Sequence, residues 1–281
     1  MVVDTRSTAD PEYTDADFQM VRRIAKHEAG IFIPESKSTL VYSRVSRRVR
    51  ESGMPSFHAY LSFAQSPAGR AEMEKLICAL TTNVTSFFRE RPHFVHMEQN
   101  VMPGLESRLR SGGRGRMWSA ACSTGQEPWS IAMSVMSSFP EAASYDMRIL
   151  ATDINSEVVA QAASGTYVES ETDGISTKQK SQFMQADGRG NLSFVGNIRQ
   201  LPAFKVLNLN ADWPMRGQFS VIFCCNVVIY FDEPTRERLW GRLAEKLEKG
   251  GFLYVGHSEK VANPRRCGLE LVAPTIYRKD S

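Results

Sequence analysis

The first third of the chain carries apolar residues at a helical period. Phe18, Val21, Ile24 and Ala25 recur at three- and four-residue steps, which places their side chains on one face of an α-helix. We expect further helices over residues 37–51, 57–64 and 71–80. Nothing before residue 90 alternates like a strand. The pattern therefore predicts a small all-helical domain over residues 1–90.

Beyond Gly112 and Gly113 the pattern changes to short apolar runs that alternate with helical stretches. Such alternation implies crossover units and a mostly parallel sheet that is covered on both faces. The expected strands are 117–121, 147–151, 204–207, 219–223 and 251–255, and the expected helices are 128–138, 156–164 and 233–249. Residues 269–277 are expected to return as an antiparallel edge strand. The predicted fold class is α/β with a doubly wound sheet, over residues 91–281.

Residues 166–203 interrupt this alternation. They are polar, and Gly188–Asn191 forms a turn candidate before the apolar residues Leu192 and Phe194. We predict an inserted subdomain over about residues 168–203, with a helix and a small antiparallel sheet.

Composition and charge narrow the classes of protein. Of 281 residues, 42% are hydrophobic and 23% are charged, and the net charge is +3. These values are typical of globular domains, and so weak a basicity does not indicate a nucleic-acid partner. No apolar run approaches the roughly 18 residues of a membrane span, and the first residues do not resemble a signal peptide. Five cysteines without a CxxC pair favour a reducing, cytoplasmic location without membrane insertion.

Two features at predicted strand ends suggest a nucleoside cofactor. Residues 119–128 place small side chains around Gly125, between a strand and a helix, where a backbone can approach a ligand. Asp153 ends the next strand, where an acid can accept ribose hydroxyls. No GK[ST] or GxGxxG motif is present, so S-adenosylmethionine fits better than NAD. The alternatives are an ordinary tight turn and a helix N-cap.

Two more segments contain candidate side chains. Asn226 and Tyr230 follow another strand at the same edge of the predicted sheet. The tandem pair Cys224 and Cys225 precedes them, and we interpret this pair as small buried residues rather than a redox pair. Residues 80–90 carry amides and hydroxyls before an aromatic pair and Arg89, at the junction of the predicted domains. The alternative for this segment is a capped helix start with a surface arginine.

Taken in order, these motifs resemble the CheR family of chemotaxis-receptor methyltransferases. The resemblance rests on residues 81–83 with 87–90, 118–128, 152–154, 226–232 and 256–259, and it spans about residues 15–278. It implies a class I methyltransferase sheet, an all-helical N-terminal domain and a small inserted β-subdomain. It also implies S-adenosylmethionine as cofactor and S-adenosylhomocysteine as product.

The resemblance assigns roles to individual residues. It implies that Arg89 and Tyr230 lie beside the methyl donor and that Asp153 holds the ribose. Cys225 stands where the family usually has arginine, and it is kept as a weak cofactor contact. The implied cofactor residues are Asn83, Thr85, Arg89, Glu127, Asp153, Asn208, Leu209, Cys225 and Asn226.

The implied substrate is a glutamate side chain in the cytoplasmic methylation region of a chemoreceptor. A carboxylate is ionised at pH 7 and needs no general base. Arg44, Arg47 and Arg48 fall within about 100° of one another on the second helix, and the resemblance implies that they meet this acidic region. The alternative is a solvated charged face. For some family members it further implies that a receptor C-terminal peptide docks on the β-subdomain by strand addition.

Other functions remain open at this point. A relative that methylates another protein carboxylate or a small acid would carry the same motifs. A module that binds S-adenosylmethionine or S-adenosylhomocysteine without transfer is favoured only by Cys225. His93 and His96 have metal-ligand spacing but no third ligand nearby, so we expect no metal. Residues 256–259 are expected to end a strand and begin a loop beside the site.

Overall fold

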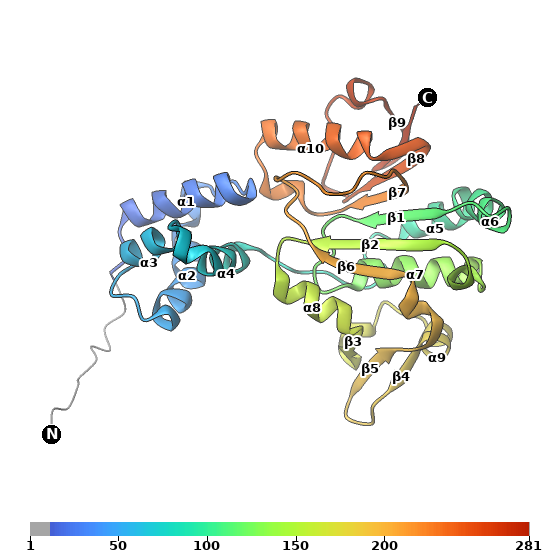
Figure 1. Ribbon diagram of the computed structural model, residues 1–281, viewed down its shortest axis with the longest axis horizontal. Helices are drawn as coiled ribbons and strands as arrows, with labels where there is room; N and C mark the ends of the chain where they lie inside the picture. The colour runs from blue at the N-terminus through green and yellow to red at the C-terminus, as the bar shows by residue number, and fades with distance from the viewer. Residues whose placement is uncertain (1–11, 281) are drawn as a thin grey trace. The chain divides into compact units, whose positions relative to one another are not determined.

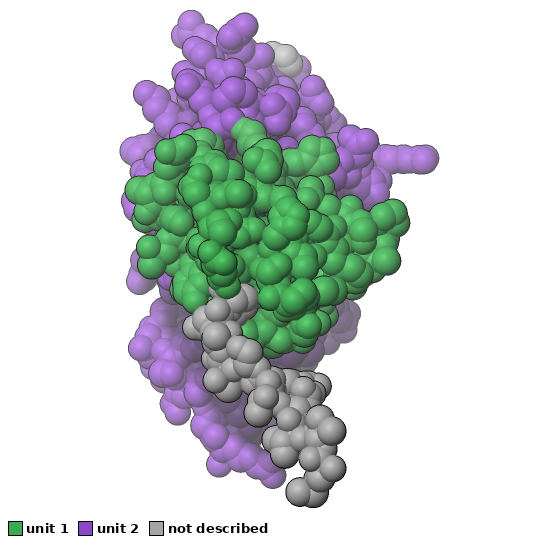
Figure 2. All heavy atoms as spheres, turned by 90° about the vertical axis from the view of Figure 1, so that its left-hand side faces the viewer, with its two compact units in different colours: residues 1–82 green, residues 83–281 purple. Residues whose placement is uncertain are grey.

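The computed structural model describes residues 12–280. The chain divides into two compact units at residues 82 and 83, which Figure 2 shows in different colours. We call residues 1–82 the helical unit and residues 83–281 the sheet unit. The predicted domain over residues 1–90 begins outside the described residues.

The described part of the helical unit contains four α-helices: α1 (Asp15–Ala29), α2 (Ser38–Ser52), α3 (Phe57–Ala64) and α4 (Arg70–Leu80). A capping box starts α1, in which Thr14 accepts from the Asp17 backbone and Asp17 accepts in return. Val21 and Val45 are fully buried in the core of this unit. The predicted all-helical N-terminal domain is confirmed.

The sheet unit contains a seven-stranded sheet in the order β6-β2-β1-β7-β8-β10-β9 (Figure 1). The first five strands in this order are parallel, whereas β10 is antiparallel to both β8 and β9. All six residues of β7 are buried, so the sheet is covered on both faces. The strands are β1 (Gly115–Ser119), β2 (Met147–Asp153), β6 (Pro202–Val206), β7 (Phe219–Cys224), β8 (Leu247–Val255), β9 (Leu269–Ala273) and β10 (Ile276–Lys279).

Several helices pack against the strands whose carboxyl ends form the candidate site. Helix α7 contacts β1 and β2, α8 contacts β2 and β6, and α10 contacts β8. Outside the insert, the helices of the sheet unit are α5 (Arg91–Asn100), α6 (Met102–Arg110), α7 (Gln126–Ser138), α8 (Ser156–Ser164) and α10 (Glu233–Glu245). Because β1, β2, β6 and β7 are parallel, their carboxyl ends meet at one edge, where ligands bind in sheets of this kind.

The inserted subdomain is confirmed as a second sheet with the order β3-β5-β4. Its strands are β3 (Thr166–Val168), β4 (Met184–Ala186) and β5 (Asn191–Phe194), all antiparallel, with α9 (Thr177–Phe183) before β4. Phe194 stacks on Trp129 of α7 with ring centroids 4.4 Å apart. This aromatic contact attaches the insert to the layer of helices.

Several element bounds differ from the predictions. The helix predicted to end at residue 249 ends at Glu245, and β8 begins at Leu247. Gly250 has φ +76°, and a Cβ on Gly251 would lie 2.9 Å from the Glu248 carbonyl. Because the strand starts in a charged stretch and is distorted at these glycines, its first residues show no apolar pattern from which a strand could be predicted. The expected edge strand is two strands, because Thr275 with φ +59° turns the chain and makes β10 internal. Helices α5 and α6 were not predicted.

None of the helices in residues 12–280 is long and apolar enough to cross a membrane.

Candidate active site

The turn after β1 is held tightly against its neighbours. The Cys122 amide donates to the Thr152 carbonyl at 2.8 Å, and the Gly125 amide donates to the Cys122 carbonyl at 2.9 Å. Gly125 has φ +99°, and a Cβ there would lie 2.6 Å from the Tyr167 hydroxyl oxygen and 2.7 Å from the Ala162 Cβ. Only glycine therefore fits, and its backbone is left uncovered by a side chain of its own.

Asp153 lies at the end of β2 with 8% of its surface exposed. Its Oδ2 accepts from the Ser123 amide at 2.9 Å, and its Oδ1 accepts from the Asn155 amide at 3.0 Å. Burial raises the pKa of Asp153, while these backbone donors oppose the rise. Asn155 caps α8 by accepting from the Glu157 amide at 2.9 Å. The N-cap alternative considered for Asp153 thus falls to Asn155, and each Asp153 oxygen can accept a further hydrogen bond.

Glu127 lies in the first turn of helix α7, directly after the loop that follows β1. The Ser119 hydroxyl donates to its Oε1 at 2.6 Å. Burial, together with the charges of Glu259 and Glu90, raises the pKa of Glu127 to about 7, although hydrogen bonds from Ser119 and Cys225 act to lower it. The site thus contains a carboxyl group that gains or loses its proton near neutral pH.

Asn208 and Leu209 follow β6 beside Asp153. The Leu207 amide donates to the Asp153 carbonyl at 2.8 Å, which holds this loop against the end of β2. The Asn208 Oδ1 accepts from the Asn210 amide at 2.9 Å, and the Leu209 carbonyl accepts from Arg242 at 2.8 Å. Both residues therefore lie at the same sheet edge as Asp153.

The loop after β7 is organised by Glu259, a residue whose role we did not predict. Its carboxylate accepts from four backbone amides, those of Asn226, Val227, Val228 and Gly256, at 2.7–2.8 Å. Asn226 has φ +61°, and Tyr230 ends the short 3-10 turn that follows. The only sequence signal for Glu259 is its place in the motif at residues 256–259, which forms a loop after β8.

Cys225 precedes Asn226 in this loop. Its sulfur lies 3.7 Å from the Tyr254 carbonyl and 4.0 Å from His93 Nδ1. Burial raises the pKa of the Cys225 thiol, so the group is neutral at pH 7. Among the described residues Cys224 and Cys225 are both free thiols; Cys224 is buried at the end of β7, whereas Cys225 follows the strand and is only partly buried.

The segment before α5 also contacts the turn after β1. The Asn83 carbonyl accepts from the Ser123 hydroxyl at 2.9 Å, and the Phe88 amide donates to Ser130 Oγ at 3.0 Å. Thr85 is partly buried and Arg89 is exposed, with its guanidinium 2.9 Å from the Val84 carbonyl. The structure thus brings Asn83 next to the loop that carries the Asp153 contact.

Comparison with known proteins shows to which family the chain belongs. Residues 83–271 match the model described as CheR methyltransferase, SAM binding domain, and residues 16–81 match CheR methyltransferase, all-alpha domain. The chain belongs to the CheR methyltransferase family. The resemblance seen in the motifs is confirmed, and the sheet unit of this CheR protein is a class I S-adenosylmethionine-binding methyltransferase domain.

Curated relatives cover nearly the whole CheR chain. A probable chemotaxis protein methyltransferase of Rhizobium etli is 46% identical over 89% of this chain and 95% of the relative. Chemotaxis protein methyltransferase 2 of Pseudomonas aeruginosa is 38% identical over 94% of this chain and 93% of the relative. The chemotaxis protein methyltransferase of Escherichia coli is 35% identical over 94% and 91%.

The residues at the sheet edge fit the family's cofactor. A buried acid at the end of β2 suits the two hydroxyls of a ribose, and the glycine turn admits a ligand close to the backbone. Amides at Asn83, Asn208 and Asn226 offer both donors and acceptors. The carboxyl of Glu127 suits a positively charged group. No phosphate-binding motif is present, as expected for a cofactor without phosphate.

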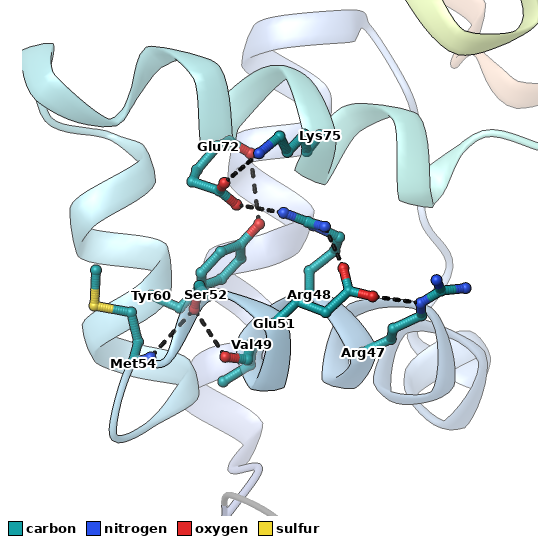
Figure 3. A network of polar contacts seen from close by, with 9 residues as sticks. All are labelled: Arg47, Arg48, Val49, Glu51, Ser52, Met54, Tyr60, Glu72 and Lys75. Atoms are coloured by element: carbon teal, nitrogen blue, oxygen red, sulfur yellow. Dashed lines mark hydrogen bonds and ion pairs between the residues drawn. The ribbon is translucent and has the colours of Figure 1, made fainter.

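The three arginines predicted to meet the substrate have different surroundings in the helical unit. Arg44 donates to the Leu80 carbonyl and to Thr82 Oγ1, both at 2.7 Å. Arg47 pairs with Glu51 at 2.7 Å and has 78% of its side chain exposed. Arg48 pairs with Glu51 and, at 2.9 Å, with Glu72, and only 19% of its side chain is exposed (Figure 3). Arg48 therefore bridges α2 and α4, and Arg47 is the most accessible of the three.

The two histidines with metal-ligand spacing have other partners. His93 Nε2 lies 2.8 Å from Thr275 Oγ1, and His96 Nδ1 lies 2.9 Å from the Tyr254 hydroxyl. Burial lowers the pKa of His93 to about 4, so its ring is neutral. Within residues 12–280 there is no group of three or more side chains suited to hold a metal ion.

Proposed function

We propose that this CheR protein transfers a methyl group from S-adenosylmethionine to glutamate side chains of chemoreceptors, giving glutamyl methyl esters. The observation that carries the proposal is the match of both family domains together with the convergence of Asp153, Glu127, Asn208 and Asn226 at one sheet edge. The relatives are named chemotaxis protein methyltransferases. The reaction would serve sensory adaptation in the cytoplasm.

The cofactor would bind along the carboxyl edge of the sheet. Asp153 would accept the ribose hydroxyls with the lone pairs that its backbone donors leave free. Asn83, Thr85 and Arg89 would lie toward the methionine end, and Leu209 would contact the nucleoside through its apolar surface. Cys225 would contribute a weak contact. When bound, S-adenosylmethionine supplies an electrophilic methyl group on a positively charged sulfur.

The protein's own contribution to the reaction is positioning. A glutamate carboxylate is already ionised at pH 7, so no residue has to remove a proton. Well-oriented reactants gain about 7–11 kcal/mol over free ones. Arg89 would orient the carboxylate without a tight two-pronged ion pair, which would blunt its nucleophilicity. Tyr230 would fix the line of attack with its hydroxyl group.

The receptor would meet the helical unit at the arginines of α2. Support is best for Arg47, because its side chain is exposed, while Arg44 and Arg48 also hold the helix in place. Rim charges of this kind raise the association rate with an acidic helix. A receptor C-terminal peptide would add as a strand to an edge of the small sheet β3-β5-β4.

Methyl-labelled S-adenosylmethionine and cytoplasmic receptor fragments test the proposal. The label should be released by mild alkali and should disappear when the acceptor glutamates are replaced by alanine. Arg89→Ala and Tyr230→Phe should lower turnover while S-adenosylhomocysteine binding to Tyr230→Phe persists. Parental turnover in both variants would remove the catalytic assignment.

A second candidate is a module that binds the cofactor without transfer. It is favoured by Cys225, which stands at a position where the family usually has arginine. Normal S-adenosylhomocysteine binding without alkali-labile label on any receptor fragment would support this second candidate.

A further inference from the structure

The loop after β8, residues 256–259, joins two segments that carry the proposed catalytic residues. One is the loop after β7, which carries Asn226 and Tyr230. The other is the segment before α5, which carries Arg89. These segments lie far apart in the sequence of the sheet unit, so contacts between them must set their relative position. The contacts of Glu259, Gly256 and His257 show what does so.

Glu259 holds the loop after β7 entirely through backbone amides. Its Oε1 accepts from Val227 and Val228, and its Oε2 accepts from Asn226 at 2.7 Å and from Gly256 at 2.8 Å. Only 5% of Glu259 is exposed, and Val227 and Val228 are buried. Buried amides without a partner are costly. Four donors therefore fix both carboxylate oxygens and, with them, the path of the loop.

Gly256 lets Asn226 lie against this carboxylate. A Cβ on Gly256 would be 2.7 Å from Asn226 Nδ2, 2.8 Å from the Asn226 amide nitrogen and 2.9 Å from Glu259 Oε2. A side chain at this position would push Asn226 away. Asn226 has a left-handed backbone with φ +61°. The Glu259 carboxylate holds its amide, and Gly256, which has no side chain, leaves the space that Asn226 occupies.

His257 connects the same loop to the segment before α5. Its backbone amide lies 3.2 Å from Glu90 Oε1, and its Nδ1 lies 2.8 Å from the same oxygen. Glu90 has 14% of its side chain exposed and follows Arg89 directly. The charge of Glu90 is also one of the causes that raise the pKa of Glu127.

We propose that Glu259 and His257 are positioning residues for methyl transfer. Glu259 would set Asn226 and Tyr230, and His257 would set Arg89 through Glu90, so that the two sides of the reaction centre face each other at a fixed separation. This inference rests on the proposed function for the roles of Arg89 and Tyr230. A misplacement of about 1 Å can lower a rate by about 100-fold, so the loop can control turnover without contacting the substrate.

Glu259→Gln tests the first contact with an isosteric side chain. Its amide group would face the donors from Asn226 and Gly256 and would repel them. We expect S-adenosylhomocysteine binding to weaken at least tenfold and kcat to fall about 100-fold, while KM for the receptor fragment changes less than threefold. The matched control is Glu248→Gln on β8, where the carboxylate pairs with Arg108 at 2.7 Å, away from the carboxyl edge. This control should retain parental kcat.

A double-mutant cycle separates positioning from a loss of stability. If Glu259 acts through Tyr230, then Glu259→Gln in a Tyr230→Phe background should lower kcat far less than it does in the parent. A merely structural effect would multiply with Tyr230→Phe. Multiplicative losses, or losses of the same size in Glu248→Gln, would overturn the proposal.

His257→Ala tests the second contact and does not depend on Glu259→Gln folding, because 69% of the His257 side chain is exposed. We expect about a tenfold lower kcat, the effect of a misplacement smaller than 1 Å, the same in Glu90→Gln, and no further loss in the double variant. Parental kcat in His257→Ala would overturn the role of His257.

The same measurements separate a failure of the positioning role from a failure of the proposed methyl transfer. If the parent protein makes glutamyl methyl esters and Glu259→Gln matches it in turnover and binding, the inference fails and the function stands. If the parent makes no ester, the function fails, and the tenfold change in S-adenosylhomocysteine affinity still tests whether Glu259 sets Asn226.

Discussion

Phe88, Ser123 and Asn226 share an unusual backbone and an unusual kind of partner. All three have positive φ, between 48° and 61°, in segments that carry proposed cofactor residues. Each donates its backbone amide to a side-chain oxygen: Phe88 to Ser130, Ser123 to Asp153 and Asn226 to Glu259. Strained backbone persists where its surroundings determine it, and it gathers at functional sites. In each of these segments, a side-chain oxygen accepts a hydrogen bond from the amide of the residue with positive φ and so holds the backbone in this conformation.

Gly125 gives the sharpest test of the turn at this scale. Gly125→Ala would place a methyl group 2.6 Å from the Tyr167 hydroxyl oxygen, so we expect a loss of about 2–3 kcal/mol in unfolding free energy and weaker S-adenosylhomocysteine binding. Gly188→Ala is the matched control, because Gly188 also has positive φ but no atom within 4 Å. Urea unfolding and calorimetry measure both effects. Equal losses in the two variants would show that backbone strain alone matters.

Glu127 predicts how cofactor binding depends on pH. Its pKa of about 7 means that the free protein protonates this carboxyl as the pH falls below 7. A neutral Glu127 attracts a cationic ligand less, so affinity for S-adenosylmethionine should fall toward pH 5, by at most tenfold per pH unit. Titration calorimetry at several pH values measures the slope.

Two variants of the same cluster control this prediction. Glu127→Gln should remove the slope between pH 5 and 7, and an unchanged slope would assign it to another group. Cys225→Arg would put a cation beside Glu127, since the Cys225 side chain hydrogen-bonds to it. The pKa of Glu127 should then drop and the fall in affinity should move to lower pH.

Some roles of individual residues could be predicted from the sequence, and others could not. Asp153 and Gly125 could be found because each has a recognisable place at a strand end. Glu259 could not be assigned a role, because three of its four partners are backbone amides more than 30 residues earlier, and a backbone amide has no sequence signature. The ion pair between Arg48 and Glu72 could not be predicted either, since the periodicity of α2 does not show which residue of α4 it will meet.

At the scale of elements, the polar side of α2 divides into a contact with α4 and a contact with solvent. The periodicity placed its arginines on one face, and the structure separates them by partner. Glu72 accepts from Arg48 at 2.9 Å and from Lys75 at 2.8 Å, near the buried ring of Tyr60, whose pKa burial raises to about 12. Arg48 therefore fastens one helix to another (Figure 3).

Alanine at the two neighbouring arginines should separate stability from recognition. Arg48→Ala leaves Glu72 without its partner from α2, so we expect about 2 kcal/mol lower unfolding free energy. Arg47→Ala removes an exposed ion pair with Glu51, so the unfolding free energy should stay nearly unchanged, and the variant should associate with the receptor more slowly, most clearly at low salt. Urea unfolding and stopped-flow binding give the two readouts. A reversed ranking in both would contradict this division.

Element ends were the least predictable part of the fold. The alternation of apolar runs predicted the parallel strands, because buried strands show themselves by composition. The end of α10 and the start of β8 lie in a charged stretch where Gly250 and Gly251 distort the strand. Helices α5 and α6 begin with prolines in their first turns, and their weak periodicity gave no prediction.

For the whole molecule, the division into two units predicts where the cofactor acts. Every proposed cofactor residue lies between Asn83 and Asn226, in the sheet unit. Hydrogen exchange with S-adenosylhomocysteine should therefore slow amides in residues 83–90, 119–127 and 225–230 and leave α1–α3 unchanged. Protection inside α2 would contradict this and would show that ligand binding reaches the arginine helix.

The strand order also has a consequence for synthesis. β1 lies between β2 and β7, and its partner β7 begins 100 residues after β1 ends. While the ribosome makes the intervening chain, β1 can pair with β2 but presents its other edge, which includes the fully buried Trp118, without a neighbour. Unpaired apolar edges attract other chains. Nascent copies of this protein are thus most prone to aggregate in that interval, and β9 must wait longer still, until β10 emerges to join it to the sheet.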